Sequence, residues 1–139
     1  MVDTRFAVSV QIMTSLAYRY GGEELMSSED FGHILQTNPT FIRKLITKLV
    51  QANLVESFRG KGGGIKLARA PREITLKEIY QAVMADKRLV ATHEKPAFKH
   101  CPVSCSMGQI LCDVVTGMER STLSYLEKQR LSDLVSKIK

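Results

Sequence analysis

The 139-residue sequence contains no tryptophan, few aromatic residues (6%) and only three cysteines. It has no run near the roughly 20 apolar residues that a membrane-spanning helix needs. Residues 1–20 are amphipathic and lack the basic start and apolar stretch of an export signal, so we expect a cytoplasmic protein. Because the cysteine count is odd, a complete set of internal disulfides is excluded, while free thiols, a metal or a redox role stay open.

The remaining composition is that of an ordinary globular protein. Hydrophobic residues make up 44% of the chain and charged residues 24%, which leaves enough apolar material for a packed core. The length fits one domain, or a compact domain that carries an added dimerisation element. A large two-domain enzyme is excluded.

Positive charge is concentrated in one segment. The formal net charge is +6, and residues 38–72 hold eight lysines and arginines against one glutamate. This segment is therefore +7, and the rest of the chain is close to neutral. Such a cluster indicates a polyanion-binding segment, although a solvated charged face is the commoner role of a charge run.

Three helices are predicted in the first half of the chain. Apolar residues recur at helical spacing over 4–20, and Gly21-Gly22 ends that helix. Ser27 can cap a short second helix, and Asn38 with Pro39 suits the start of a third helix that runs to about residue 52. The buried side of the second helix is expected to consist of Phe31, Ile34 and Leu35. The inward stripe of the third consists of Ile42, Leu45, Ile46, Leu49 and Val50.

The free side of the third helix is basic. Two short helices joined by a three-residue turn, the second with a basic free side, predict a helix-turn-helix. The major groove of B-DNA is about 12 Å wide and admits one helix, whose first residues can reach base edges. An ordinary helical hairpin in a core is the alternative. The side chains on this free side are Thr40, Phe41, Arg43, Lys44, Thr47 and Lys48.

A glycine-rich β-hairpin is predicted directly after the third helix. Residues 54–59 and 65–68 are rich in Leu, Val, Phe and Ile, as strands are, and Gly60-Lys61-Gly62-Gly63-Gly64 lies between them. Arg59 and Lys61 add positive charge at the tip, which can lie against phosphates or enter the minor groove. A nucleotide-phosphate loop is disfavoured, because such loops lead from a strand into a helix.

The second half of the chain is predicted to be mainly helical. Residues 75–78 form a capping box for a fourth helix with a structural role, and residues 85–100 form a polar connecting loop. The last helix or helices cover 102–138 and carry an apolar stripe too long for a small domain to cover, so we expect a partner chain to cover it. Its members are Val103, Met107, Ile110, Leu111, Val114, Val115, Met118, Leu123 and Leu126.

The order of these elements resembles one known family. Ser27-Ser28-Glu29-Asp30, the run from Phe41 to Leu49, and Arg59-Gly60-Lys61-Gly62-Gly63-Gly64 are together similar to the Rrf2 family of bacterial winged helix-turn-helix transcriptional regulators. The resemblance implies a mainly α fold with a small β-hairpin (α+β). It also implies a homodimer that binds a pseudo-palindromic DNA operator, most simply as a repressor.

The resemblance divides the chain and assigns residues to DNA. Residues 1–84 correspond to the winged helix-turn-helix domain, 85–103 to a sensor or connecting loop, and 104–139 to the dimerisation helix region. The early residues of the recognition helix and the arginine of the wing fall on DNA-binding positions of the family. We therefore expect DNA contacts from Ser28, Thr40, Phe41, Arg43, Lys44, Lys48, Arg59, Lys61, Gly62 and Gly63.

The cysteines resemble members of the family without an iron–sulfur cluster. Cluster-binding members commonly space three cysteines five residues apart, whereas three residues separate Cys101 from Cys105 here and six separate Cys105 from Cys112. Val8 also stands where some cluster binders have an acidic ligand. We therefore assign no cofactor, and an iron–sulfur cluster stays as an alternative.

The cysteine positions favour a redox thiol over a disulfide. On one helix Cys105 and Cys112 lie roughly 10 Å apart, beyond the reach of a disulfide. Cys101 is the preferred reactive thiol, because amides at a helix start and His100 can stabilise its thiolate. Cys112 is expected to be a small buried hydrophobe. Zinc held by cysteines with His93 or His100 ranks low, since the tight paired spacing of structural zinc sites is missing.

An enzyme is the rival class. The three histidines, His33, His93 and His100, are scattered, and Cys101 with His100 is the only nucleophile and base pair. Adjacent residues rarely face each other productively. The sequence therefore predicts a DNA-binding regulator and no enzyme.

Overall fold

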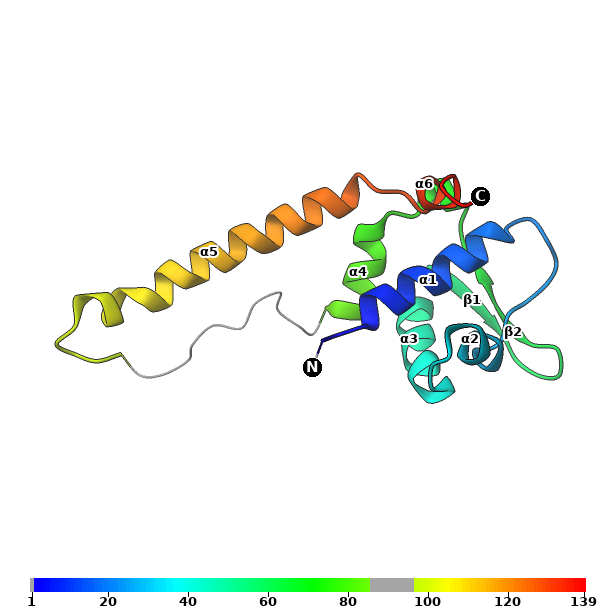
Figure 1. The fold of residues 1–139 in the computed structure, drawn as a ribbon, viewed down its shortest axis with the longest axis horizontal. Coiled ribbons are helices and arrows are strands. Elements are labelled where there is room, and N and C mark those ends of the chain that lie inside the picture. The colour runs from blue at the N-terminus through cyan, green and yellow to red at the C-terminus, as the bar shows by residue number, and fades with distance from the viewer. Residues whose placement is uncertain (1, 86–96) are drawn as a thin grey trace.

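The structure is a computed structural model, and it describes residues 2–85 and 97–139 (Figure 1). Most of the predicted loop over 85–100, with His93, lies outside the described residues. The described residues form six α-helices, one short 3-10 helix and a two-stranded sheet. In chain order these are α1 (Arg5–Tyr18), α2 (Ser28–Leu35), α3 (Pro39–Gln51), β1 (Val55–Phe58), β2 (Gly64–Leu67), η1 (Pro71–Glu73), α4 (Leu76–Met84), α5 (Pro102–Glu127) and α6 (Leu131–Val135).

The elements form a head from which one long helix projects. Figure 1 shows α1 to α4, the hairpin and α6 packed together, while α5 extends away from them. The core of the head centres on Phe31, Ile12 and Leu49, which are fully buried. Leu126 at the end of α5 and Leu131 in α6 join the same core. Among the described helices, none combines the length and apolarity needed to cross a membrane.

The predicted caps of α2 and α3 are confirmed. The Asp30 amide donates to Ser27 Oγ at 3.1 Å, and the Ser27 amide donates to the Asp30 carboxylate at 2.8 Å. The Thr40 amide donates to Asn38 Oδ1 at 2.8 Å. The Ser27 amide, then its hydroxyl, lowers the pKa of the Asp30 carboxyl. The capping energy is therefore present at neutral pH and is lost as the pH falls through this lowered value.

The helix-turn-helix packs differently from the prediction at two side chains. Ile34, expected in the buried face of α2, is 51% exposed. The helix is turned so that Gly32 faces the start of α3, where a Cβ atom would lie 2.9 Å from the Pro39 ring. Phe41, expected on the free side of α3, is half-buried against the core.

The hairpin is attached to the head by a third extended segment. Strands β1 and β2 pair antiparallel, with Val55 opposite Leu67 and Phe58 opposite Gly64. The Ile65 amide donates to the Met26 carbonyl at 2.8 Å, and the Met26 amide donates back at 3.3 Å. The segment before α2 therefore fixes the hairpin beside α2 and α3.

The chain returns to the head after α5. The predicted capping box of α4 is confirmed, because Thr75 Oγ1 accepts from the Glu78 amide at 3.2 Å. The Leu76 amide donates to the Gln129 carbonyl, and the Leu131 amide donates to the Ile74 carbonyl, each at 2.9 Å. These bonds hold α6 against η1 and α4, so the base of α5 is fixed at both ends.

One buried hydroxyl in α1 lacks a hydrogen-bond partner. Ser9 is fully buried, and its Oγ makes no hydrogen bond among the described residues. Burying an unpaired polar group costs about 1–3 kcal/mol. We expect Ser9→Ala to raise the free energy of unfolding by about 1 kcal/mol, measured by urea denaturation. A loss of stability would show that the hydroxyl has a partner.

Candidate nucleic-acid interface

Three separate parts of the head meet at one open pocket of about 390 Å³. The start of α2 contributes Ser28, the middle of α3 contributes Arg43, and the hairpin tip contributes Gly63. These three residues were predicted to contact DNA from separate motifs, and the fold brings them together. The pocket is also lined by Met26, Ser27, Ile46, Thr47, Ser57, Gly60, Gly64 and Ile65.

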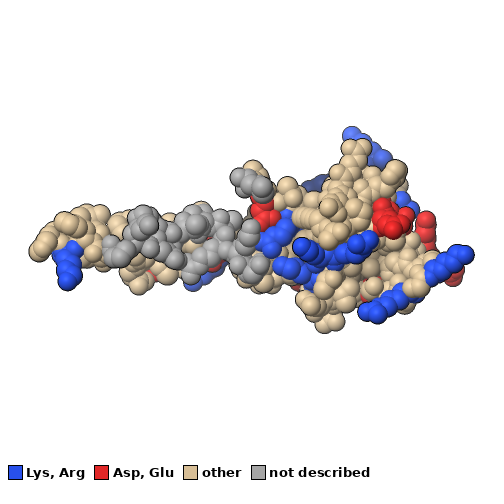
Figure 2. Space-filling view, turned by 90° about the horizontal axis from the view of Figure 1, so that it is seen from below, with Lys and Arg blue, Asp and Glu red and all other residues tan. Residues whose placement is uncertain are grey.

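The exposed side of α3 is basic. Thr40, Arg43 and Lys44 are exposed on it, and Lys48 is half-buried. Within the described parts of the chain, neither Arg43 nor Lys44 forms an ion pair with a carboxylate. Figure 2 shows lysine and arginine side chains gathered on this face of the head. The helix can therefore present positive charge to a polyanion.

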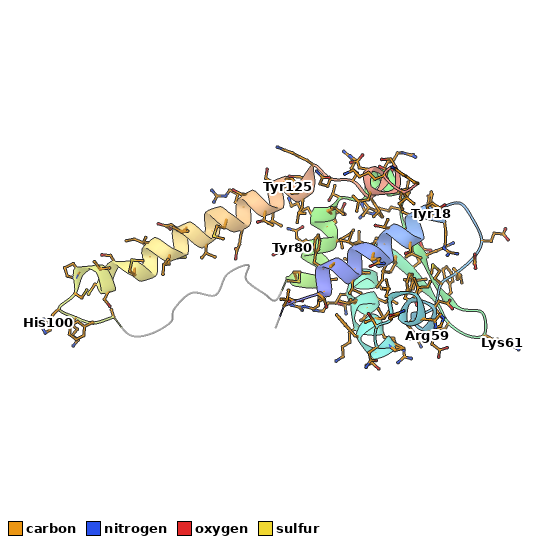
Figure 3. The ribbon with its side chains drawn as sticks, viewed as in Figure 1. Tyr18, Arg59, Lys61, Tyr80, His100 and Tyr125 are labelled. Carbon is orange, nitrogen blue, oxygen red and sulfur yellow. The ribbon has the colours of Figure 1, made fainter. Side chains whose placement is uncertain are left out.

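The hairpin places two further cations beyond the body of the head. Arg59 and Lys61 are exposed, and Figure 3 shows Lys61 at the far tip of the hairpin. The turn is closed by the Gly63 amide, which donates to the Gly60 carbonyl at 2.9 Å. Gly62 has a φ of 80°, in the left-handed region that glycine adopts without strain.

Not all of the basic segment faces this pocket. Arg69 forms an ion pair with Glu78 and donates to the Glu73 carbonyl at 3.3 Å. The Lys66 ammonium lies 5.1 Å from the centre of the Phe58 ring, and Lys66 stands opposite Glu56 in the hairpin. These cations stabilise the head, so the charge count of the sequence overstates the cations free to bind DNA.

Two pocket residues were outside the predicted set of site residues. Thr47 was placed on the free face of α3, and Ser57 on β1 was not noticed at all. Ser57 stands opposite Ile65 in the sheet register, and both line the pocket. The alternation of side chains along a strand is the signal that could have placed Ser57 on this face.

The last glycine of the hairpin is required by a close backbone approach. A Cβ atom on Gly64 would lie 2.6 Å from the Met26 carbonyl oxygen, which is backbone and cannot rotate away. The pairing of Met26 with Ile65 creates this approach. A side chain at position 64 therefore forces the hairpin away from the segment before α2.

We expect Gly64→Ala to destabilise the head by about 1–3 kcal/mol, the usual cost of overpacking. Urea denaturation measures the change, and hydrogen exchange of the Ile65 amide should become faster. Gly117→Ala is the matched control, because Gly117 lies within α5 and a Cβ atom there meets nothing within 4 Å. The control should be neutral or stabilising. Equal stability of the two variants would contradict the close approach.

The three cysteines are free thiols at the distal end of α5. Cys101 caps the helix: its Sγ accepts from the Ser104 amide at 3.4 Å, and Cys105 lies one turn later with its amide on the Cys101 carbonyl at 3.1 Å. Cys105 and Cys112 both lie on α5. The prediction that Cys112 is buried is wrong, since it is exposed on a helix that projects from the head.

The described residues do not present the ligands of a metal or cluster. No three histidine, cysteine, aspartate or glutamate side chains within residues 2–85 and 97–139 lie close enough together to hold a metal ion. Cys101 and Cys105 share one turn, but Cys112 lies two turns further along α5. One chain therefore does not fit an iron–sulfur cluster held by these cysteines.

The chain is similar to proteins of one family along its length. The Rrf2 sequence model, described as iron-dependent transcriptional regulator, matches residues 2–137. The chain is 30% identical to YwnA of Bacillus subtilis over 98% of both chains. It is 33% identical to the HTH-type transcriptional regulator IscR of Cereibacter sphaeroides, over 94% of this chain and 83% of the relative. The solved structure of CymR, the global cysteine regulator of B. subtilis, superposes with a TM-score of 0.69 at 22% identity and covers all of this chain and 98% of CymR.

Proposed function

Because the chain belongs to the Rrf2 family of DNA-binding transcriptional regulators, we propose that it binds a pseudo-palindromic operator as a homodimer and represses transcription from it. The carrying observation is the pocket in which Ser28, Arg43 and Gly63 meet. The family's members are regulators and not enzymes, so the rival based on Cys101 and His100 is set aside.

The proposed contacts divide between bases and phosphates. The first turns of α3 enter the major groove, where Thr40 and Arg43 reach base edges. Lys44 and Lys48 contact phosphates on either side, and the start of α2 at Ser28 directs amides at a third phosphate. Phe41, which is half-buried, holds α3 in place more than it reads bases.

The hairpin is the wing in this proposal. Arg59 and Lys61 lie against the sugar–phosphate backbone or in the adjacent minor groove. Gly62 and Gly63 carry no side chain, so the backbone of the wing can approach a phosphate closely. Residues 1–84 and the returning helix α6 form the DNA-binding unit.

The exposed side of α5 is the proposed dimer interface. Ile110, Val114 and Met118 are 48%, 52% and 42% exposed and recur every four residues. This spacing places them along one side of the helix. A second copy of the chain can cover this side, and twofold symmetry then presents two α3 helices to two half-sites.

Retention of genomic DNA tests the proposal. Purified protein is mixed with fragmented genomic DNA, retained fragments are sequenced, and binding of the common site is measured against salt. We expect a site with twofold symmetry and an affinity that falls steeply with salt, as phosphate contacts require. A stably monomeric protein that binds no duplex at low salt contradicts the proposal.

We further propose that Cys101 makes the regulator sensitive to oxidants. Its sulfur is half-exposed and accepts the Ser104 amide at the start of α5, as reactive thiols often do. Hydrogen peroxide should oxidise Cys101 before Cys112, which mass spectrometry of peptides measures, and should weaken operator binding. Cys101→Ser should abolish this response, whereas Cys112→Ser should keep it. A response that survives Cys101→Ser contradicts the role.

The cofactor has its own test. We expect protein purified without oxygen to be colourless and free of iron, because one chain does not present a cluster ligand set. Brown protein with stoichiometric iron would overturn the thiol proposal in favour of a cluster-sensing regulator.

A further inference from the structure

A second surface of the head has the opposite character from the DNA interface. Two adjoining pockets of about 300 and 320 Å³ lie beside α1 and α2 and share Arg19, Met26 and Ile34 in their walls. The first pocket is mainly apolar in its exposed side chains, and the second is acidic. Neither contains Arg43, Lys44 or a residue of the hairpin.

The apolar part is built from side chains of three separate segments. Tyr18 at the end of α1, Ile34 on α2 and Ile138 near the C-terminal end line one pocket and are 64%, 51% and 46% exposed. Single exposed apolar residues are ordinary, but several around one hollow mark a contact site. Figure 3 shows Tyr18 apart from Arg59 and Lys61, which lie on the hairpin.

The acidic part excludes DNA as the ligand of this surface. Glu24, Glu29 and Asp30 line the second pocket, and Arg19 is its one lysine or arginine. Arg19 is already paired with Glu24 at 3.4 Å, so the lining has a net charge of −2 with His33 neutral. Such a surface repels phosphate and attracts lysine and arginine side chains.

The two surfaces are adjacent because α2 contributes to both. Ser28 at the start of α2 lines the DNA pocket, while Ile34 near its end lines the acidic and apolar pockets. Met26 borders all three. A regulator on its operator therefore presents this second surface next to the DNA, within reach of a protein bound to the neighbouring duplex.

We propose that this surface, defined by Tyr18, Ile34, Ile138, Glu24 and Glu29, docks a segment of RNA polymerase that carries lysine or arginine around an aliphatic side chain. The occupant follows from charge and apolarity: carboxylates meet cations, and the hollow beside Ile34 receives the apolar side chain. The proposal rests on the proposed function, since polymerase and regulator must lie on one promoter.

Photo-crosslinking on promoter DNA tests the contact. Benzoylphenylalanine replaces Tyr18, and the labelled regulator is bound to a promoter fragment that contains its operator, with and without RNA polymerase holoenzyme of the same bacterium. We expect a polymerase crosslink from position 18. The same label at Tyr125, which is also 64% exposed but lies on α5, should give none.

Surface variants separate docking from DNA binding. Ile34→Asp and Glu24→Lys should each lower the crosslink yield at least fivefold and leave operator affinity within about twofold. Glu73→Lys is the matched control, because Glu73 is exposed on η1 outside this surface; it should keep the full yield. Operator binding without a polymerase crosslink, or an equal fall in the control, overturns the docking proposal alone. Failure of the unsubstituted protein to bind an operator overturns the proposed function and the docking with it.

Discussion

Arg43→Ala is expected to weaken operator binding by about 1–3 kcal/mol per half-site, or roughly 5- to 150-fold, and to relax specificity at one base pair. Arg43 lies on the exposed side of α3 and lines the pocket between α2 and the hairpin. Its guanidinium can donate two parallel hydrogen bonds to a guanine edge, and alanine can donate none. The discrimination against other bases is therefore lost together with the affinity.

Lys44→Ala is the matched comparison. Lys44 is the neighbouring exposed cation of α3, and in the proposal it meets phosphate rather than base. Its loss should weaken binding to all sequences alike and reduce the salt slope by about 1 per contact. Fluorescence anisotropy with operators altered at single positions, repeated at several salt concentrations, distinguishes the two. An Arg43→Ala variant that loses affinity equally on every sequence would contradict base recognition.

Local chemistry made much of this interface predictable. The caps at Ser27, Asn38 and Thr75 depend on residues two or three positions away, and all three form as predicted. The hairpin depends on a turn of consecutive glycines and forms between the predicted strands. Interactions within a few residues are encoded in the sequence itself, because no distant segment has to be known.

The errors arise where distant segments meet. Ile34 is exposed because the approach of Pro39 to Gly32 sets how α2 is turned, and Cys112 is exposed because α5 leaves the head. The pairing of Met26 with Ile65 joins segments 39 positions apart. Periodicity marks a helix and an apolar side, but it does not say which neighbour covers that side. The same limit hid Ser57 from the predicted site.

The apolar side of α5 should be the most sensitive surface of the protein to a single charge. Val114 lies between Ile110 and Met118 on this side. In a twofold interface each substitution occurs twice, so Val114→Glu introduces two carboxylates where apolar surface should be buried. We expect a monomer by analytical ultracentrifugation at micromolar concentration. The folded state should persist, because position 114 is exposed in one chain and glutamate is a good helix former.

Loss of the dimer should lower operator affinity far more than loss of any one DNA contact. Two linked half-site contacts strengthen binding by about 10²- to 10⁴-fold over one, so Val114→Glu should weaken operator binding at least about 100-fold while the head keeps its circular dichroism spectrum. Thr116→Glu is the matched control, since Thr116 is exposed on the far side of the same turn. It adds the same charge and should leave both the dimer and the affinity intact. A dimeric, fully active Val114→Glu variant would place the partner elsewhere, whereas equal disruption by Thr116→Glu would show that charge anywhere on α5, rather than burial of this side, governs assembly.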